Sequence, residues 1–265
     1  MNKNVIFIML TVAVIATGVF FYRLRNVPLA LVETAPASVK PAQVAAVNKA
    51  PTVPVRATGT PAVVGHGIIK FKVPFTAQAP FGEWSDPRQQ DACEEASVLM
   101  AVSWARGETF TLQQAKEKIL AMADWEQKKY DNYQDTSARD TVERFFKEYY
   151  NYQQAWVVEN IKLPDIINQL EQGNLVIVPA NGQALHNPFF TAPGPVEHML
   201  LIIGYDYGTK EFITNEAGTR HGQDYRYGQD VLYAAIRDYP TGHHAPIVGI
   251  QKTMIVVQKQ ATKVE

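Results

Sequence analysis

The distribution of apolar residues along the chain first marks out a short uncharged segment near its start. Residues 5–21 carry no charge and lie between Lys3 and the pair Arg23 and Arg25. Their length is close to the lower limit of about 17 residues for a membrane-spanning helix. No small-x-small cleavage site follows directly, so we expect residues 1–26 to form an uncleaved transmembrane signal anchor. Positive charge on both flanks leaves the orientation open.

The next segment has no helical or strand period. Residues 27–66 are rich in Ala, Pro and Val, with scattered Lys and Thr. Because prolines interrupt every candidate element, this segment is typical of an extended, flexible linker. From Ile68 onward the alternation changes to that of a strand, and aromatic residues become frequent. We therefore expect one folded domain over residues 67–265.

Within this domain, apolar residues recur first with helical and later with strand periodicity. Asp91 and Glu94 have the spacing of a capping box, so a helix should begin there and end near Gly107. Further helices are predicted over Thr111–Ala123 (with a capping box at Gln114), Ser137–Tyr150, Pro164–Gln172 and Gly228–Asp238. Strands are predicted over residues 175–180, 198–206, 211–216 and 247–258. Helices followed by a largely antiparallel sheet indicate the α+β class.

Composition narrows the function classes. The formal net charge is -1, and the basic residues do not cluster, so the electrostatic signature of a nucleic-acid-binding protein is missing. The sequence contains one cysteine, which cannot form an intramolecular disulfide. It also lacks the HExxH, paired-cysteine, Asp-rich and phosphate-loop motifs. We therefore expect no metal and no cofactor, and we expect the histidines of the 240s loop, His243 and His244, to be solvated.

Cys93 is the first candidate for chemistry. It falls at the second position of the predicted helix, where unpaired backbone N–H groups and the helix dipole favour a thiolate. Glu94 and Glu95 follow at once, and their negative charge opposes thiolate formation. A lone cysteine is also often just a small buried hydrophobe. A catalytic role for Cys93 therefore requires a base nearby.

His198 is the candidate base because it opens an apolar strand and could face the start of the Cys93 helix. Asn215 and Glu216 end the next predicted strand, which the turn at 205–208 should pair with the His198 strand as a hairpin. Alternation along a strand sends these two side chains to opposite faces, so only one of them can orient His198. We favour Glu216, with Asn215 as the alternative.

Four segments, in this order, resemble the C39-like peptidases: VPFTAQAPFGEW, DACEEASVLM, GPVEHMLLIIGYD and FITNEAGTRHG. The resemblance covers roughly residues 68–240 and implies a papain-like cysteine peptidase fold, with the Cys93 helix packed on the sheet. It implies Cys93 as nucleophile, His198 as base and Glu216 where the family has an aspartate. It also implies a glutamine that supports the oxyanion, for which Gln78 matches the local pattern and Gln90 is the nearer alternative.

The resemblance implies thiol-dependent hydrolysis of peptide or isopeptide bonds through an acyl-enzyme. From the anchor and the linker, residues 1–26 and 27–66, we expect the chain to bind the membrane through its N-terminal helix and to hold the catalytic domain at the cell surface, outside the cytoplasm. Two alternatives use the same residues differently. One is a cell-wall amidase or acyltransferase with the same dyad. The other is a binding module that has kept the fold and lost turnover.

Overall fold

The structure is a computed structural model that describes residues 67–259. The predicted anchor and linker, residues 1–26 and 27–66, lie outside the described residues. Among the residues it does describe, none of the helices combines the length and the apolar character needed to cross a bilayer. The domain boundary near residue 67 and the anchor therefore stay predictions.

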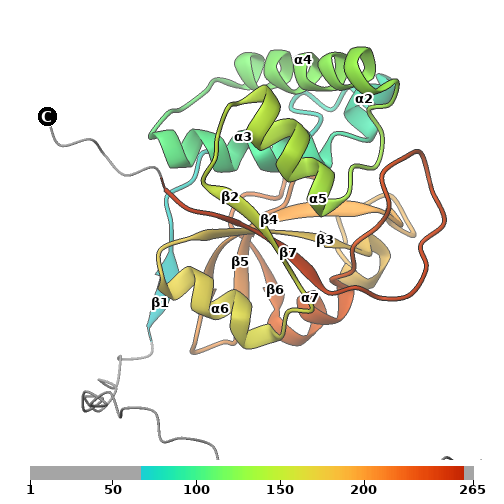
Figure 1. Cartoon of the computed structure of the whole chain (residues 1–265). Helices are drawn as coiled ribbons and strands as arrows, with labels where there is room; N and C mark the ends of the chain where they lie inside the picture. Colours follow the sequence, from blue (N-terminus) through green and yellow to red (C-terminus); the bar gives the residue numbers. More distant parts are fainter. Residues whose placement is uncertain (1–66, 260–265) are drawn as a thin grey trace, which may run out of the picture. The chain divides into compact units, whose positions relative to one another are not determined.

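A seven-stranded sheet forms the centre of the domain (Figure 1). Its strands run in the order β2-β7-β3-β4-β5-β6, and β1 pairs with the last residues of β4, beyond the point where β3 begins. Every pairing is antiparallel. The strands are β1 (Ile68–Lys70), β2 (Ala155–Glu159), β3 (Leu175–Ala180), β4 (His198–Asp206), β5 (Glu211–Asn215), β6 (Tyr225–Gly228) and β7 (Thr253–Val257).

Helices cover both faces of this sheet. The helical elements are α2 (Pro87–Gln90), α3 (Cys93–Arg106), α4 (Leu112–Tyr130), α5 (Ala138–Asp140), the π-helix η1 (Thr141–Tyr149), α6 (Leu163–Glu171), the 3-10 turn η2 (Gly182–Leu185) and α7 (Gln229–Ala235). Figure 1 shows α3 and α4 on one side of the sheet and α6 and α7 on the other. The predicted α+β class, with a largely antiparallel sheet, is confirmed.

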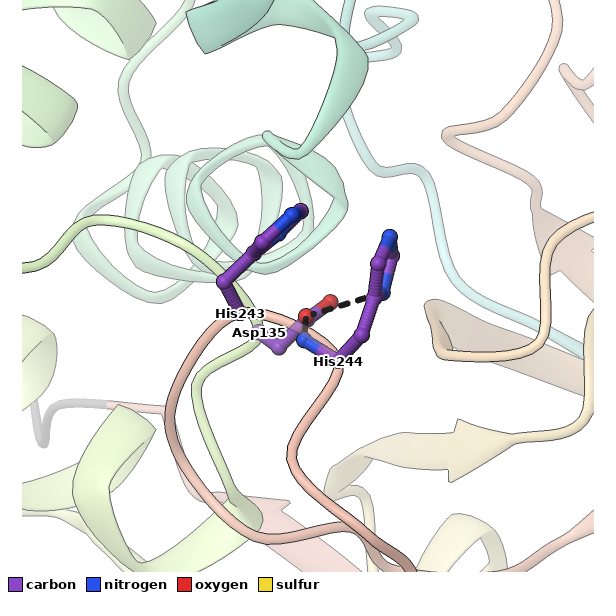
Figure 2. A group of neighbouring side chains, drawn as sticks. All are labelled: Asp135, His243 and His244. Atoms are coloured by element: carbon purple, nitrogen blue, oxygen red, sulfur yellow. Dashed lines mark hydrogen bonds and ion pairs between the residues drawn. The ribbon is translucent and has the colours of Figure 1, made fainter. Parts of the chain in front are cut away.

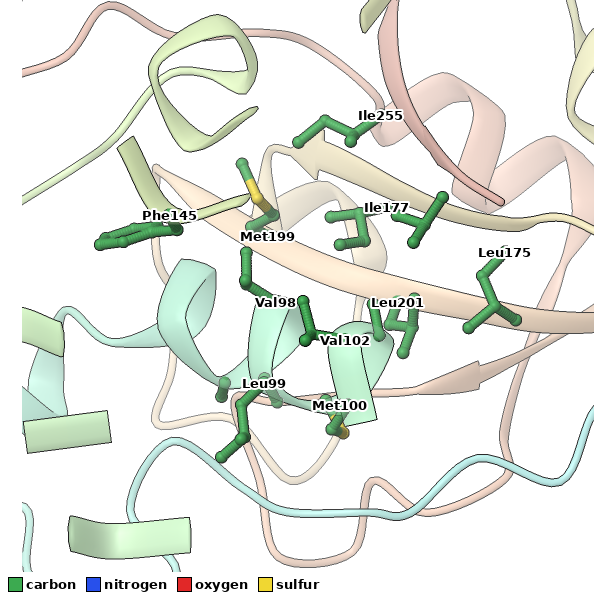
Figure 3. Close-up of a cluster of buried hydrophobic side chains, with 14 of the residues drawn as sticks. Val98, Leu99, Met100, Val102, Phe145, Leu175, Ile177, Met199, Leu201 and Ile255 are labelled. Carbon is green, nitrogen blue, oxygen red and sulfur yellow. The ribbon is translucent and has the colours of Figure 1, made fainter. Parts of the chain in front are cut away.

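Two hydrophobic cores follow from this layering. Along β3, Leu175 and Ile177 point into the core beneath α3, whereas Val176 and Val178 point into the core beneath α6 and α7. Figure 3 shows the first of these cores, with side chains of α3 meeting those of β3 and β4. A strand covered on both faces needs apolar residues at every position, which is why β3 and β4 read as continuous apolar runs.

The N-terminus of α3 differs from the prediction. Ala92 is the N-cap and supplies no side-chain hydrogen bond, so the expected Asp91–Glu94 capping box is wrong. Cys93 is consequently the first helical residue rather than the second. The reason is that Glu94 turns into the protein interior, where tertiary partners bind its carboxylate. The predicted end is confirmed, since Gly107 closes the helix in a left-handed conformation with φ 71°.

The other helices follow the predicted pattern with shifted ends. The capping box between Thr111 and Gln114 is present, but α4 continues to Tyr130 rather than Ala123. Met122 and Glu126 extend its buried face beyond the predicted end. Ser137 caps the α5–η1 segment, and α6 ends at the expected glycine, Gly173.

Two strands were missed, and their omission made the predicted order of elements wrong. The helices do not all precede the sheet, because β2 lies between η1 and α6. β2 and β6 are the two edges of the sheet. Both edge strands are incompletely covered and carry a charged side chain, Glu159 in β2 and Arg226 in β6, so their apolar runs are shorter than those of β3 and β4. The last predicted strand is also shorter, because residues 247–252 precede β7 as an irregular segment.

Candidate active site

A cleft of about 600 Å³ lies where α3 and β4 both begin. Cys93 and His198 both line it, together with Gln78 and Gln90. Two aromatic side chains on its walls, Phe189 and Trp84, are 49% and 40% exposed, although large apolar groups are usually covered. The cleft therefore offers both candidate reactive groups and apolar surface for a ligand.

Cys93 is held against the start of β4. The Ser97 hydroxyl, one turn further along α3, donates to the Met199 carbonyl at 3.3 Å. The Met199 backbone N–H faces the Cys93 sulfur, and Met199 directly follows His198. The side chain of Cys93 is 7% exposed and lines the cleft. The helix start and the strand start thus bring the cysteine and the histidine to the same wall.

His198 is paired with Glu216. Its Nε2 lies 2.6 Å from Glu216 Oε1, and both side chains are buried. Phe190 packs edge-on against the imidazole, with ring centroids 5.3 Å apart. Because Nε2 is engaged by the carboxylate, Nδ1 is the ring nitrogen left to exchange a proton with a group in the cleft.

The Glu216 carboxylate is itself fixed by neutral donors. The Gly218 N–H donates to Oε1 at 2.8 Å, and the Tyr227 hydroxyl donates to Oε2 at 2.9 Å. Asn187 in turn donates to the Tyr227 oxygen at 2.7 Å. A Cβ at Gly218 would lie 2.8 Å from Phe190 Cε1 and 3.1 Å from His198 Cε1, so only glycine fits here. This network fixes the orientation of the imidazole.

Asn215 lies elsewhere. Its amide nitrogen donates to the Pro74 carbonyl at 3.4 Å, and its oxygen accepts from the Asp224 N–H at 3.4 Å. Of the two candidates to orient His198, only Glu216 contacts the imidazole. The catalytic role of either residue is a separate matter and stays a prediction.

Both candidate oxyanion glutamines line the cleft, but their amide groups are engaged. Gln78 Nε2 donates to the carbonyls of Gln89 at 3.0 Å and Gln90 at 2.8 Å. Gln90 Nε2 donates to the Trp84 carbonyl at 2.6 Å. Gln78 is also joined through its backbone N–H to the Ala217 carbonyl, beside Glu216. Gln78 could therefore hold an oxyanion only by releasing one of its two carbonyl partners.

The electrostatics around Cys93 favour the neutral thiol. The sulfur donates to Glu94 Oε2 at 3.0 Å. Burial, followed by the charge of Glu94, raises the pKa of the thiol well above its usual range, and the Met199 N–H offsets only part of this. Burial also raises the pKa of Glu94 to about 7, although hydrogen bonds from the thiol and from the Tyr239 hydroxyl lower it in part. The resting cysteine is thus a neutral thiol hydrogen-bonded to the Glu94 carboxyl group.

Three contributors to the site were not predicted as such: Asn187, Phe190 and Tyr227. Asn187 and Phe190 belong to the loop between η2 and β4, whose sequence carries no motif that assigns a role to either residue. Tyr227 lies on the unpredicted edge strand β6. The sequence signal for this strand is the alternation of two aromatic residues, Tyr225 and Tyr227, two positions apart.

A cysteine and a carboxylate-bound histidine in one cleft are the groups that nucleophilic thiol chemistry requires. The chain belongs to the Peptidase_C39 like family, whose model matches residues 70–252. No curated protein matches it. Among solved structures, it is similar to one described as a candidate C39-like peptidase from Bacillus anthracis, with 14% identity over 74% of this chain and 99% of the other, and a TM-score of 0.48.

Proposed function

We propose that this protein is a cysteine peptidase that hydrolyses peptide or isopeptide bonds through an acyl-enzyme, on a papain-like arrangement of groups. The observation that carries the proposal is the buried His198–Glu216 pair, 2.6 Å between Nε2 and Oε1, in the cleft that Cys93 also lines. Membership of a peptidase family supports the same reaction class.

In the proposed reaction, His198 Nδ1 takes the proton of the Cys93 thiol as the sulfur attacks the carbonyl carbon of the substrate. The C–N bond then breaks, and the imidazolium returns the proton to the leaving amine, which leaves a thioester on Cys93. A water molecule, deprotonated by the same imidazole, then attacks the thioester carbon; the C–S bond breaks, the acid leaves, and the imidazolium returns the proton to the Cys93 sulfur. Glu216 keeps its charge throughout and stabilises the transient imidazolium.

The oxyanion would be held at the start of α3. The N–H of Cys93 has no partner within the helix, because it belongs to the first residue of α3. Gln78 would supply a second donor after exchanging its hydrogen bond to Gln89 or Gln90 for one to the oxyanion. One such donor contributes roughly 3 kcal/mol to the transition state.

A non-enzymatic binding module is the second candidate, and one observation favours it. The Cys93 thiol is bound to Glu94 and buried, so its pKa is raised rather than lowered as in a preformed thiolate. If the protein is a peptidase, the thiol transfers its proton to His198 during the attack, so a thiolate need not form beforehand. In the binding-module reading, the thiol stays inert and the cleft only binds its ligand.

The test is hydrolysis of a mixed peptide library, with new termini identified by mass spectrometry. We expect cleavage by the full-length protein and its loss in Cys93→Ser, while Glu117→Gln, a change at an exposed position of α4 outside the cleft, keeps cleavage. Cleavage that survives in Cys93→Ser would rule out the proposed nucleophile. If the wild type cleaves nothing in the library, the binding module becomes the better account.

The membrane tether is part of the proposal and rests on the sequence of residues 5–21 alone. An anchor followed by a long Pro-rich linker would hold the domain away from the bilayer surface. Reporters that fluoresce or react on only one side of the membrane, fused to each end of the chain, test both the tether and the outward orientation. Recovery of both fusions in the unbound fraction would contradict the tether.

A further inference from the structure

A group of metal-ligating side chains, two of which line the same cleft, includes neither Cys93 nor His198. Asp135, His243 and His244 each offer one ligand atom, and these atoms lie within 4.8 Å of one another (Figure 2). Asp135 precedes α5, whereas the two histidines belong to the loop between α7 and β7. The fold therefore brings together ligand atoms that are far apart in the sequence.

Backbone hydrogen bonds fix this arrangement. The Gly242 N–H donates to the Asp135 carbonyl at 2.9 Å, and the His244 N–H donates to the Asp135 carboxylate at 2.6 Å. Asp135 and His244 both adopt the left-handed conformation, with φ of 49° and 47°. Non-glycine residues seldom adopt it, so the two turns are built for a specific placement of their side chains.

The charges around Asp135 are unbalanced. Its side chain is 8% exposed, and its ion contact is His244 Nδ1 at 3.4 Å. The same nitrogen lies 3.4 Å from the carboxylate of Glu197, which is 9% exposed. Over residues 67–259, no lysine or arginine forms an ion pair with either carboxylate. Two nearly buried carboxyl groups thus share one imidazole as their ion contact.

We propose that Asp135, His243 and His244 bind a divalent transition metal of the Zn²⁺ class. Two imidazoles and one carboxylate are the ligand set that Zn²⁺ accepts, whereas Ca²⁺ and Mg²⁺ require oxygen ligands throughout. The cation would lie beside the carboxyl groups of Asp135 and Glu197, both of which are 3.4 Å from His244 Nδ1. Three protein ligands leave a further coordination position for water or for Glu197.

Binding requires a small adjustment of the histidines. Metal–ligand bonds of about 2.0–2.2 Å bring the ligand atoms of a tetrahedral site closer together than the present 4.8 Å limit. His243 and His244 are both exposed, so their rings can rotate without disturbing the core. The bound metal would tie the 240s loop to Asp135. Because Asp135 and His244 line the cleft, the bound metal would fix the shape of the cleft wall that these two residues form.

The experiment titrates the purified full-length protein, carrying a tag without histidine, with Zn²⁺ against a chromogenic chelator. We expect one Zn²⁺ per chain in the wild type and in Cys93→Ser, and affinity weakened by more than about 100-fold in His243→Ala/His244→Ala. The matched control His186→Ala/His221→Ala removes two histidines from other loops and should bind as the wild type does. Circular dichroism confirms that each variant is folded.

Co²⁺ distinguishes this site from coordination by the cysteine. We expect visible d–d absorption without a thiolate-to-cobalt charge-transfer band in the wild type, and loss of that absorption in the double histidine variant. Absence of Zn²⁺ binding, equal binding by the double histidine variant, or binding that disappears in Cys93→Ser would each overturn the proposal. Asp135→Asn, which keeps the side-chain size, should also weaken Zn²⁺ binding, as the double histidine variant does.

Discussion

Replacing Glu94 with glutamine tests how strongly the buried carboxyl next to the nucleophile prefers its neutral form. The side chain is 2% exposed and accepts hydrogen bonds from Cys93, Thr136 and Tyr239. Burial raises its pKa from 4.5 to about 7. At 1.36 kcal/mol per pH unit, ionising it in the folded protein costs about 3 kcal/mol more than in the unfolded chain.

The sign of the pH effect follows from this raised pKa. Below pH 4.5 both folded and unfolded forms are protonated, so the group contributes no pH dependence. Between pH 4.5 and about 7 the unfolded chain loses its proton first, so the wild-type free energy of unfolding falls as pH rises. Glu94→Gln removes this loss, so between pH 4.5 and about 7 the wild type should lose about 3 kcal/mol relative to the variant.

The assay is urea unfolding of wild type and variant across this pH range, with Glu117→Gln, an exposed glutamate on α4, as the control. The control should follow the wild type at every pH. The variant should also react faster with iodoacetamide, because a neutral amide no longer repels the Cys93 thiolate. Parallel pH dependences of stability in wild type and Glu94→Gln would refute the assigned electrostatics.

Three further predictions follow from the site and the fold. Glu216→Gln should lower peptide cleavage by on the order of 100-fold, far more than Asn215→Ala, because only Glu216 orients His198; equal losses in steady-state assays would contradict this. Gly218→Ala should displace Phe190 and His198 and reduce kcat, which a variant with unchanged kinetics would disprove. Thr111→Ala removes the N-cap of α4 and should lower the free energy of unfolding in urea by about 1 kcal/mol. An unchanged free energy of unfolding would contradict a stabilising role of this cap.

The central strands could be predicted from sequence because burial on both faces leaves a strong local signal. β3 and β4 are buried along their whole length, and their continuous apolar runs were visible in the sequence. The edge strands β2 and β6 are partly exposed and short, so their patterns resemble those of loops. The existence of β2 also depends on its pairing with β7, far later in the chain, which no local pattern encodes.

Within the site, the sequence predicted which side chains could react but not how they are bound. Strand alternation required Asn215 and Glu216 to face opposite sides, yet the choice between them depends on Tyr227 and Gly218, which hold the Glu216 carboxylate. Glu94 had the spacing of a capping residue. Its actual partner, the Tyr239 hydroxyl, is far away in sequence, so tertiary contact overrode the local motif.

The central claim is that Cys93 reacts because His198 takes its proton. The most direct measurement is the rate of Cys93 labelling by an electrophilic thiol probe across pH, in wild type, His198→Ala and the control His186→Ala, which changes an exposed histidine outside the cleft. We predict labelling near neutral pH in the wild type and the control, and its loss in His198→Ala until the pH approaches the raised pKa of the thiol. Identical pH profiles in all three proteins would show that the histidine does not activate the sulfur.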